Sequence, residues 1–343
     1  MTASHRRVAW ITVCLFLAAL LGVPGLFRLR ECARQRHAVS LLQIHLGSYP
    51  NLSVEYGEEG KAIRAAEWVA DQLYEFTGWE TGRNIVGQFR PVSGLDIRRS
   101  TLASDDWQAI LACRDIKKLY LMHTNVSDAQ IATLSQLSSL ETLLLDEAKV
   151  GTGCRNLRSL TRLKGLVVSE TNISDDDLLA IGGLPALEYL GLSRTSLTDK
   201  CAPFFGHCPR LTTLPVNDTH VGDRVVAELT KCSALESLNL TRTQVTDAAA
   251  GDLLAITSLS ELTVKFSRIS DVGISRLAEK RNLRQLVVDA SQVTPRSIAA
   301  LKRQGTLRTL FVEGSNAEEL EEKTTLLKRE LNKTLVDSIL ISP

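Results

Sequence analysis

The stretch LESLNLTRTQVTD, residues 235–247, decides the fold of this chain, because nearly the same string returns at a fixed interval. The pattern starts ten times, and every interval is 24 residues except one of 23. The starting residues are Val92, Ile116, Leu140, Leu163, Leu187, Leu211, Leu235, Leu259, Leu283 and Leu307. Self-similarity at a period of this size is typical of a solenoid, in which each repeat forms one coil.

Each repeat predicts a strand, a turn and a short helix. Leu235, Leu238 and Leu240 fit a strand that turns its leucines inward. The ninth place is Ser or Thr in nine of the ten repeats, and a buried hydroxyl there can hydrogen-bond the backbone of the turn in its own or the next coil. Thr246 and Asp247 are favoured N-cap residues before a helix-forming run. In the second repeat, residues 127–130 (SDAQ) have capping-box spacing.

Such a unit cannot bury its apolar side alone, so the coils must stack on one another. We therefore expect an α/β horseshoe with a parallel sheet on its concave face and short helices on its convex face. At a strand spacing of about 4.8 Å, the sheet would be on the order of 50 Å long. That would be a large concave surface.

The strings LKGLVVSETNISD, LEYLGLSRTSLTD, LESLNLTRTQVTD and LSELTVKFSRISD resemble those of leucine-rich repeat proteins, and the resemblance covers residues 92–317. Cys113, Cys208 and Cys232 precede the next repeat, as in the cysteine-containing class of the family. The family's usual ninth residue is Asn or Cys, and the Thr or Ser found here resembles bacterial members with an N-terminal membrane segment. The resemblance implies a right-handed solenoid that binds proteins or other macromolecules, and it implies no reaction.

The sequence predicts four regions. Residues 1–30 form a membrane anchor, residues 31–91 an N-terminal capping region, residues 92–317 the repeats, and residues 318–343 a C-terminal cap of one helix and one strand. Caps are expected because the ends of a solenoid expose apolar core. A separate signalling domain is the alternative for the N-terminal region, and a coiled-coil dimer is the alternative for the C-terminal helix.

The N-terminal stretch VAWITVCLFLAALLGVPGLF, residues 8–27, carries no charge over 20 residues. As a helix it would span roughly 30 Å, the thickness of the hydrocarbon core. It predicts a transmembrane helix, and hence a single-pass membrane protein, located in the bacterial inner membrane if the family resemblance holds. A cleaved signal peptide is the alternative, although no small-x-small cleavage site follows. Basic residues on both flanks leave the side of the repeats open.

The sequence predicts no enzyme, no cofactor and no metal site. Seven cysteines occur without a C-x-x-C pair, and Cys208 and Cys232 occupy the same column of adjacent coils, which indicates core packing. A disulfide between them stays open for an oxidising compartment. The recurring aspartates are explained as helix caps rather than as a calcium ladder. Forty basic residues against 39 acidic ones leave no excess to attract nucleic acid.

We therefore expect a module that binds a protein or other macromolecule and is not an enzyme. Two other classes remain. A substrate-recognition adaptor of the ubiquitin-ligase type would need an apolar docking helix upstream of the repeats. An architectural cell-envelope protein would need a self-complementary surface.

The binding face is predicted from strand residues that point away from the core. Tyr120, Leu144 and Val167 occupy the middle outward place of consecutive repeats, with Met122 and His123 beside them. Three large apolar groups side by side on a sheet indicate an interaction site. The alternatives are that the N-terminal cap covers this stripe, or that the face lies near Phe266, Val287 and Phe311. The predicted charged rim consists of Arg98, Arg99, Asp146, Glu147 and Glu170.

Two repeats depart from the pattern. The third is one residue short, with Ala148 in place of the hydroxyl and Thr152 in place of the aspartate, so its turn should open most readily. In the sixth, Pro215 falls inside a predicted central strand, so one inter-strand hydrogen bond should be missing and the sheet should bend there.

Overall fold

The computed structural model describes residues 34–36, 38–40, 43, 52–56, 92–314, 321–322, 325–327 and 339–342. The chain divides into two compact units, one of Met1–Tyr120 with Gln136–Leu140 and the other of Leu121–Ser135 with Glu141–Pro343. The predicted membrane anchor, residues 1–30, lies outside the described residues, and so does most of the predicted N-terminal capping region.

The first unit contains the opening repeat. Strand β1 (Leu52–Tyr56) pairs antiparallel with β2 (Val92–Ile97), and β2 pairs in parallel with β3 (Lys118–Tyr120). Helix α4 (Ser104–Ala112) follows β2. The side chain of Gln35 accepts a hydrogen bond from the backbone N–H of Val92 at 3.1 Å, which ties the predicted capping region to the start of the first repeat.

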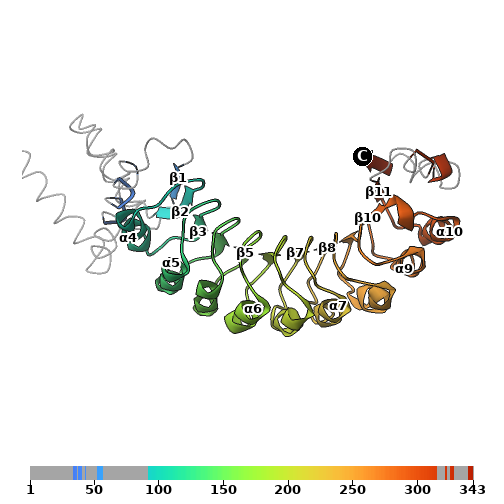
Figure 1. The fold of residues 1–343 in the computed structure, drawn as a ribbon, viewed down its shortest axis with the longest axis horizontal. Helices are drawn as coiled ribbons and strands as arrows, with labels where there is room; N and C mark the ends of the chain where they lie inside the picture. Colours follow the sequence, from blue (N-terminus) through green and yellow to red (C-terminus); the bar gives the residue numbers. More distant parts are fainter. Residues whose placement is uncertain are drawn as a thin grey trace, which may run out of the picture. The chain divides into compact units, whose positions relative to one another are not determined.

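The second unit continues with one strand per repeat, each pairing in parallel with its neighbour in chain order. The strands are β4 (Thr142–Leu144), β5 (Gly165–Val167), β6 (Tyr189–Gly191), β7 (Thr213–Pro215), β8 (Ser237–Asn239), β9 (Glu261–Thr263), β10 (Gln285–Asp289), β11 (Thr309–Glu313) and the closing β12 (Ile339–Ser342). Along this unit the strands line the inner side of a curve (Figure 1).

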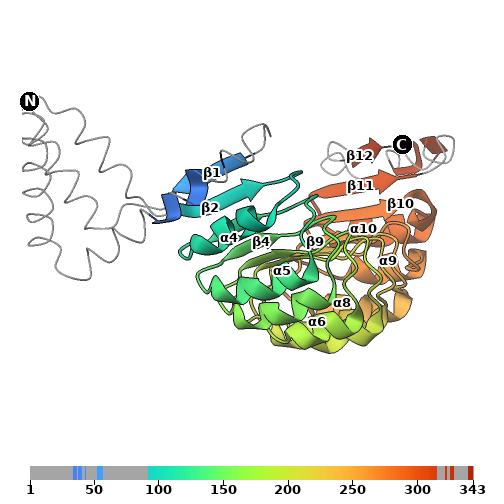
Figure 2. The same ribbon diagram turned by 60° about the vertical axis from the view of Figure 1, so that its left-hand side comes forward.

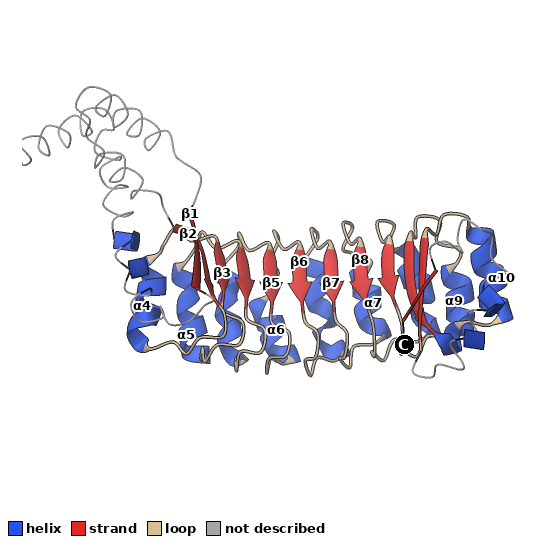
Figure 3. Ribbon diagram, turned by 90° about the horizontal axis from the view of Figure 1, so that it is seen from above, coloured by secondary structure: helices blue, strands red, loops and turns tan. Residues whose placement is uncertain are grey.

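Helices cover the outer side of the same curve (Figure 1), and the view from above shows them behind the strands (Figure 3). They are α5 (Asp128–Thr133), η2 (Leu134–Gln136), η3 (Thr152–Ser159), α6 (Asp175–Ile181), η4 (Asp199–His207), α7 (Asp223–Leu229), η5 (Asp247–Ala249), α8 (Ala250–Ala255), α9 (Asp271–Leu277), η6 (Ala290–Gln292) and α10 (Pro295–Gln304), the η elements being 3-10 helices. At the C-terminal end, β10, β11 and β12 lie side by side with α9 and α10 outside them (Figure 2). The described coils therefore have the predicted architecture of a leucine-rich repeat solenoid.

The core lies between sheet and helices, and the repeated leucines fill it. Leu235, Leu238 and Leu240 are at most 1% exposed. Cys208 and Cys232 are buried free thiols whose Sγ atoms donate to the carbonyls of Phe204 and Phe205. Burial raises the pKa of Cys208 to about 11 and that of Cys232 to about 12, so both stay protonated at neutral pH. Core packing is confirmed for these thiols, and no disulfide joins them.

The hydroxyl at the ninth place closes the turn of its own coil. Thr195, Thr219 and Thr243 are buried, and each Oγ1 donates to the backbone carbonyl three residues earlier at 2.7 Å. The same bond is made by Thr124, Thr171 and Ser267. The polar group is thereby satisfied inside the core, as the sequence predicted.

The aspartates do more than cap their own helices. Thr246 is the N-cap of its helix and Asp247 is the first helical residue. The Asp247 carboxylate accepts from the backbone N–H and the hydroxyl of Ser270 in the next coil, at 2.8 and 2.6 Å. Asp128, Asp175, Asp199, Asp223 and Asp271 also bond the following coil. The interpretation as simple caps is therefore corrected, since these carboxylates bind one coil to the next.

The predicted localisation is contradicted. Among the described residues, no helix combines the length and apolar character needed to cross a membrane. Helix α10, for example, has ten residues, whereas a spanning helix needs about 20.

Candidate binding face of the sheet

The short strands of the second unit divide their side chains between core and surface. In β4, β5, β7 and β8 the central residue is buried and both flanking residues are half-buried. This follows from the two-residue period of a strand, which sends Leu143 inward and Thr142 and Leu144 outward. The outward residues form the inner face of the curve.

The predicted site residues fall on this face in part. Leu144 and Val167 are register partners on β4 and β5, and both are half-buried. Met122 is half-buried, and His123 is exposed. Tyr120 ends β3 in the first unit and is also half-buried. The second unit therefore brings Leu144 and Val167 together as one apolar row.

Tyr189 is an exposed aromatic residue of the same face that the sequence analysis did not single out. It occupies the first outward place of β6 and is 40% exposed, the one large exposed hydrophobic residue on the described strands. Its register partner on β5 is Gly165, and Val167 is paired with Gly191. A Cβ atom at Gly191 would lie 2.6 Å from Cγ1 of Val167, so a larger residue there would force the Val167 side chain to shift. Tyr189 thus lies beside two positions of the sheet that carry no side chain.

Burial and the nearby charge of Asp146 both raise the pKa of the Tyr189 hydroxyl, which therefore stays a hydrogen-bond donor at neutral pH. Burial is also the main cause that raises the pKa of the Asp146 carboxyl itself. The apolar row is accordingly bordered by one phenol and one partly desolvated carboxyl group.

Pro215 interrupts the strand pairing between β6 and β7. Strand β7 pairs with β8 at three register positions but with β6 at only one, Tyr189 with Thr213. Proline has no N–H to give to the ladder, so the loss on one side was expected. The predicted interruption is confirmed on the β6 side, and it leaves another apolar side chain on the same face.

Beyond the strand ends, the eighth place of successive repeats adopts a left-handed backbone. The residues are Arg99, His123, Glu147, Glu170, Arg194, Asp218, Arg242 and Phe266, with φ between 51° and 57°. None is glycine, although this conformation costs other residues about 1–2 kcal/mol. For most of them the backbone N–H donates to a carbonyl of the following coil, as Arg194 does to Asn217 at 2.8 Å, which offsets part of that cost.

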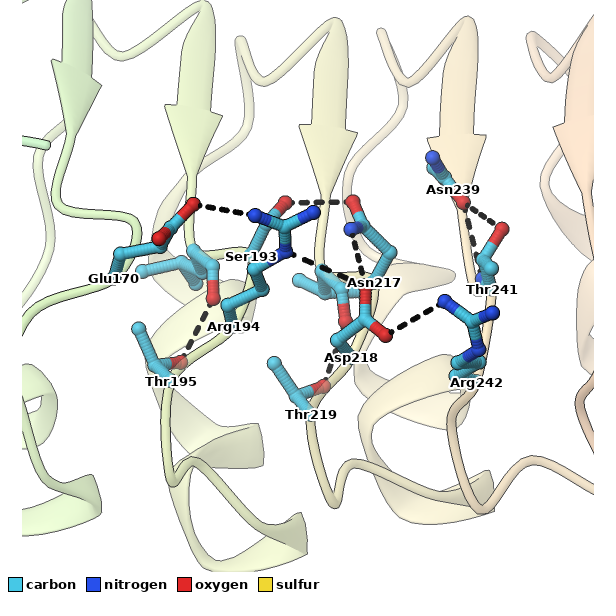
Figure 4. A network of polar contacts seen from close by, with 12 residues as sticks. Glu170, Ser193, Arg194, Thr195, Asn217, Asp218, Thr219, Asn239, Thr241 and Arg242 are labelled. Carbon is cyan, nitrogen blue, oxygen red and sulfur yellow. Dashed lines mark hydrogen bonds and ion pairs between the residues drawn. The ribbon is translucent and has the colours of Figure 1, made fainter.

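The side chains of this column pair along the edge of the sheet, as Figure 4 shows for its central part. Arg194 lies 2.8 Å from Glu170 and 3.9 Å from Asp218, and Arg242 lies 3.3 Å from Asp218. The Arg242 guanidinium stacks over the ring of Phe266 at 5.3 Å. His123 Nδ1 lies 2.8 Å from Glu147 Oε2. The predicted charged rim is therefore largely occupied by its own ion pairs, which a partner would meet as an ordered polar edge.

The alternative face near the C-terminal coils is less open. Val287 and Phe311 are register partners on β10 and β11, but Val287 is only 8% exposed. Phe266 is half-buried and covered on one side by Arg242. In addition, Lys265 pairs with Glu313 across the intervening coil. Polar contacts therefore bridge the space that a partner's apolar groups would need.

The described residues contain no group of three or more His, Cys, Asp or Glu side chains able to hold a metal ion. The repeated aspartates are engaged with backbone N–H and hydroxyl donors of the next coil, as shown for Asp247 and Ser270.

Comparisons with known proteins add only distant likenesses. No family model and no curated protein matches this sequence. Among solved structures, a chain of the octameric complex of Latrophilin 3, Unc5D and FLRT2 is 16% identical, with a TM-score of 0.42, over 67% of this chain and 70% of that chain. An internalin, InlF from Listeria monocytogenes, is 16% identical, with a TM-score of 0.39, over 77% of this chain and 93% of that chain.

The plant peptide hormone receptor RGFR1, solved in complex with RGF2, is 20% identical with a TM-score of 0.42; the match covers 74% of this chain and 41% of the receptor. These likenesses are too distant to indicate a function for this chain. Its fold is argued from the coils themselves.

Proposed function

We propose that this chain is a non-catalytic repeat module that binds a protein partner on the inner face of its second unit. The contact is centred on an apolar patch formed by Leu144, Val167 and Tyr189. The membership of the cysteine-containing, threonine-for-asparagine class of leucine-rich repeats, as found in bacteria, is part of the same proposal.

The observation that carries the proposal is the exposure of Tyr189. Large exposed hydrophobic side chains are few in the described residues, namely Leu179, Tyr189 and Val272, and Tyr189 is the one that lies on the sheet. Tyrosine is enriched at the energetic centres of interfaces because its ring buries apolar area while its hydroxyl keeps a hydrogen bond. Leu144 and Val167 extend the apolar area on β4 and β5 of the same face, and Gly165, the register partner of Tyr189, has no side chain to cover its ring.

The polar edge supports the same placement. Glu170, Arg194, Asp218 and Arg242 already neutralise one another, so a partner would not have to displace unpaired charge to reach the patch. Side chains held in such a network lose little further conformational freedom on binding, which favours affinity.

The test places a photo-crosslinking amino acid at position 189 of the full-length chain and compares it with the same amino acid at position 179 or 272. These two control positions lie on α6 and α9 and are 37% and 43% exposed, close to the 40% of Tyr189. We expect one reproducible protein adduct from position 189 that is absent from both controls. Adducts of equal yield from all three positions would contradict the proposal.

A second variant separates binding from folding. Val167→Asp should abolish the adduct at position 189 and leave the melting temperature nearly unchanged, because Val167 is half-buried on an open face. The double change Tyr120→Ala with Leu144→Asp should act in the same way. A loss of several degrees of stability with the adduct retained would place these side chains in the structural core.

A further inference from the structure

The second unit has a cavity of about 720 Å³ at the edge where the helices end and the strands begin. It is formed by equivalent places of consecutive coils, because Ser260, Arg284 and Arg308 follow one another at intervals of 24 residues. Arg281 and Glu236 complete its charged lining. The volume falls within the range of about 300–1,000 Å³ that small-molecule sites usually have.

The backbone around this cavity is fixed by the coil ladder. The N–H of Arg284 donates to the carbonyl of Ser260, and the N–H of Arg308 to that of Arg284, both at 2.8 Å. The side-chain amide of Asn282 donates hydrogen bonds to the carbonyls of Thr257 and Leu259. The walls are thus held in place before any ligand binds.

The three arginines of this lining have no counter-ion among the described residues. Within residues 92–314, the guanidinium groups of Arg281, Arg284 and Arg308 make no ion pair and no side-chain hydrogen bond to the protein, and all three are exposed. The second residue of an earlier coil does have a counter-ion, since Lys164 pairs with Glu141 of the preceding coil at 2.8 Å. Arg284 and Arg308 place like charges on adjacent coils, an arrangement that is unfavourable without an anion between them.

Helix ends do not explain this cluster. Cations are often placed at helix C-termini to offset the dipole, and Arg281 follows α9 closely enough for that role. Arg284 and Arg308 lie at the beginnings of strands instead. Lys280, the neighbouring cation, is buried and donates to the carbonyls of Leu254 and Ile256, so its charge is already used.

We infer that this cavity binds a soluble small molecule through a phosphate monoester group held by Arg281, Arg284 and Arg308. Three guanidinium charges against the one carboxylate of Glu236 leave a net charge of +2 in the lining. A phosphate monoester carries about −1.5 to −2 at neutral pH, which matches that excess, whereas a carboxylate or sulfate ester supplies a single charge. Guanidinium groups also bind phosphate oxygens in a bidentate manner.

The test uses the full-length chain and phenyl phosphate as the probe, with phenyl sulfate as a singly charged analogue of similar shape. Binding is followed by titration calorimetry for the wild type, for Arg284→Gln with Arg308→Gln, and for Arg224→Gln with Arg296→Gln. The last pair removes the same charge from exposed arginines on α7 and α10 that do not line this cavity.

We expect the wild type to prefer phenyl phosphate to phenyl sulfate by at least about tenfold, and the cavity variant to weaken phosphate binding by at least about tenfold. The control pair should stay within about twofold of the wild type. Circular dichroism confirms that each variant is folded.

Three results would overturn the inference. They are equal binding of the sulfate and phosphate esters, equal loss in the cavity and control pairs, and no binding of phenyl phosphate by the wild type. Binding to phosphatidylcholine vesicles containing phosphatidic acid, without binding of phenyl phosphate, would also overturn it, because the ligand would then be a lipid surface. Failure here leaves the proposed protein-binding face untouched, since Tyr189 takes no part in the cavity.

Discussion

The third and seventh coils, residues 140–162 and 235–258, build the same turn from different contacts. In the seventh coil, Thr243 closes the turn with its hydroxyl, Thr246 caps the helix with its side chain, and Asp247 binds the next coil. In the third coil, Ala148 closes the turn through its backbone N–H alone, at 3.0 Å from the carbonyl of Leu145. Its N-cap is Gly151, which makes no side-chain cap bond.

The third coil holds its place by close packing instead. A Cβ atom at Gly153 would lie only 2.4 Å from the backbone carbonyl oxygen of Asp128 in the preceding coil. Arg155 of the same 3-10 helix reaches forward to Asp177, a carboxylate whose side chain is 4% exposed, at 2.6 Å. The shorter third coil therefore relies on close backbone packing where the seventh coil relies on side-chain hydrogen bonds. A substitution that adds volume should destabilise the third coil and leave the seventh unaffected or more stable.

The largest difference should come from adding one methyl group to each coil. Gly153→Ala forces a methyl group into the backbone of Asp128 and should cost about 3 kcal/mol of unfolding free energy. Gly251→Ala in the seventh coil meets only the flexible end of Arg276, at 3.1 Å, and should be neutral or stabilising because it lies inside helix α8. Urea unfolding of both variants measures this, and equal costs would show that the third coil is not packed more tightly.

Removing the bond between coils should have the next largest effect. Asp247→Ala deletes two charge-assisted hydrogen bonds to Ser270 and should cost about 2 kcal/mol. Asp252→Ala, on the same stretch of the chain, makes no described side-chain bond and serves as the control. If Asp247→Ala lowered the unfolding free energy no more than Asp252→Ala, the bonds from Ser270 to Asp247 would not stabilise the fold.

Local opening should differ by a smaller amount. Amide hydrogen exchange of residues 143–152 should be faster than that of residues 238–247 by several-fold, because a missing side-chain cap and hydroxyl bond together cost about 1 kcal/mol or more. Equal protection of the two segments would mean that close packing at Gly153 fully compensates for the missing polar contacts.

The smallest effect is expected at the polar edge, where Arg242 of the seventh coil pairs with Asp218. Partial burial raises the pKa of Asp218, but the Asn217 amide and the charges of Arg242 and Arg194 outweigh it, so the pKa lies below its usual value. A carboxylate with a lowered pKa stabilises the fold above its unfolded pKa of about 3.9, and this stability is lost as the pH falls through the folded pKa.

Asp218→Asn should therefore cost about 0.5 kcal/mol or less at neutral pH, and the difference from the wild type should vanish in acid. Melting temperatures measured from about pH 7 down to about pH 2 test this. A difference in melting temperature that grows on acidification would mean that the ionised Asp218 does not stabilise the fold.

Much of this architecture was predictable because each coil repeats local rules. The strand, the turn hydroxyl of Thr243 and the N-cap at Thr246 all follow from residues close together in the sequence. The bond from Asp247 to Ser270 was missed because it joins residues 23 apart in different coils. The left-handed backbone at the eighth place was missed because a positive φ is usually predicted from a glycine, and Arg, Glu and Asp stand there instead.

The candidate site was predicted less well than the fold. Leu144 and Val167 were found because they share one place in consecutive repeats. Tyr189 was overlooked because its exposure depends on the small neighbours Gly165 and Gly191, which no single column of the repeat reveals. The membrane localisation was inferred from the apolar N-terminal stretch alone, which lies outside the described residues, and no helix among the described residues is long and apolar enough to span a membrane.

The aspartate bonds also determine how the array could be shortened by recombination. Deleting residues 235–258 as one cassette would bring Asp223, which now binds Thr246, opposite Ser270, and a serine accepts that role as Ser270 already does for Asp247. The helical edge would tolerate the splice. The opposite edge would not, because Asp218 would lose Arg242 and face Phe266 instead. At the helical edge, one coil can therefore replace another without losing the bond between coils. At the opposite edge, each coil depends on the particular side chain of its neighbour.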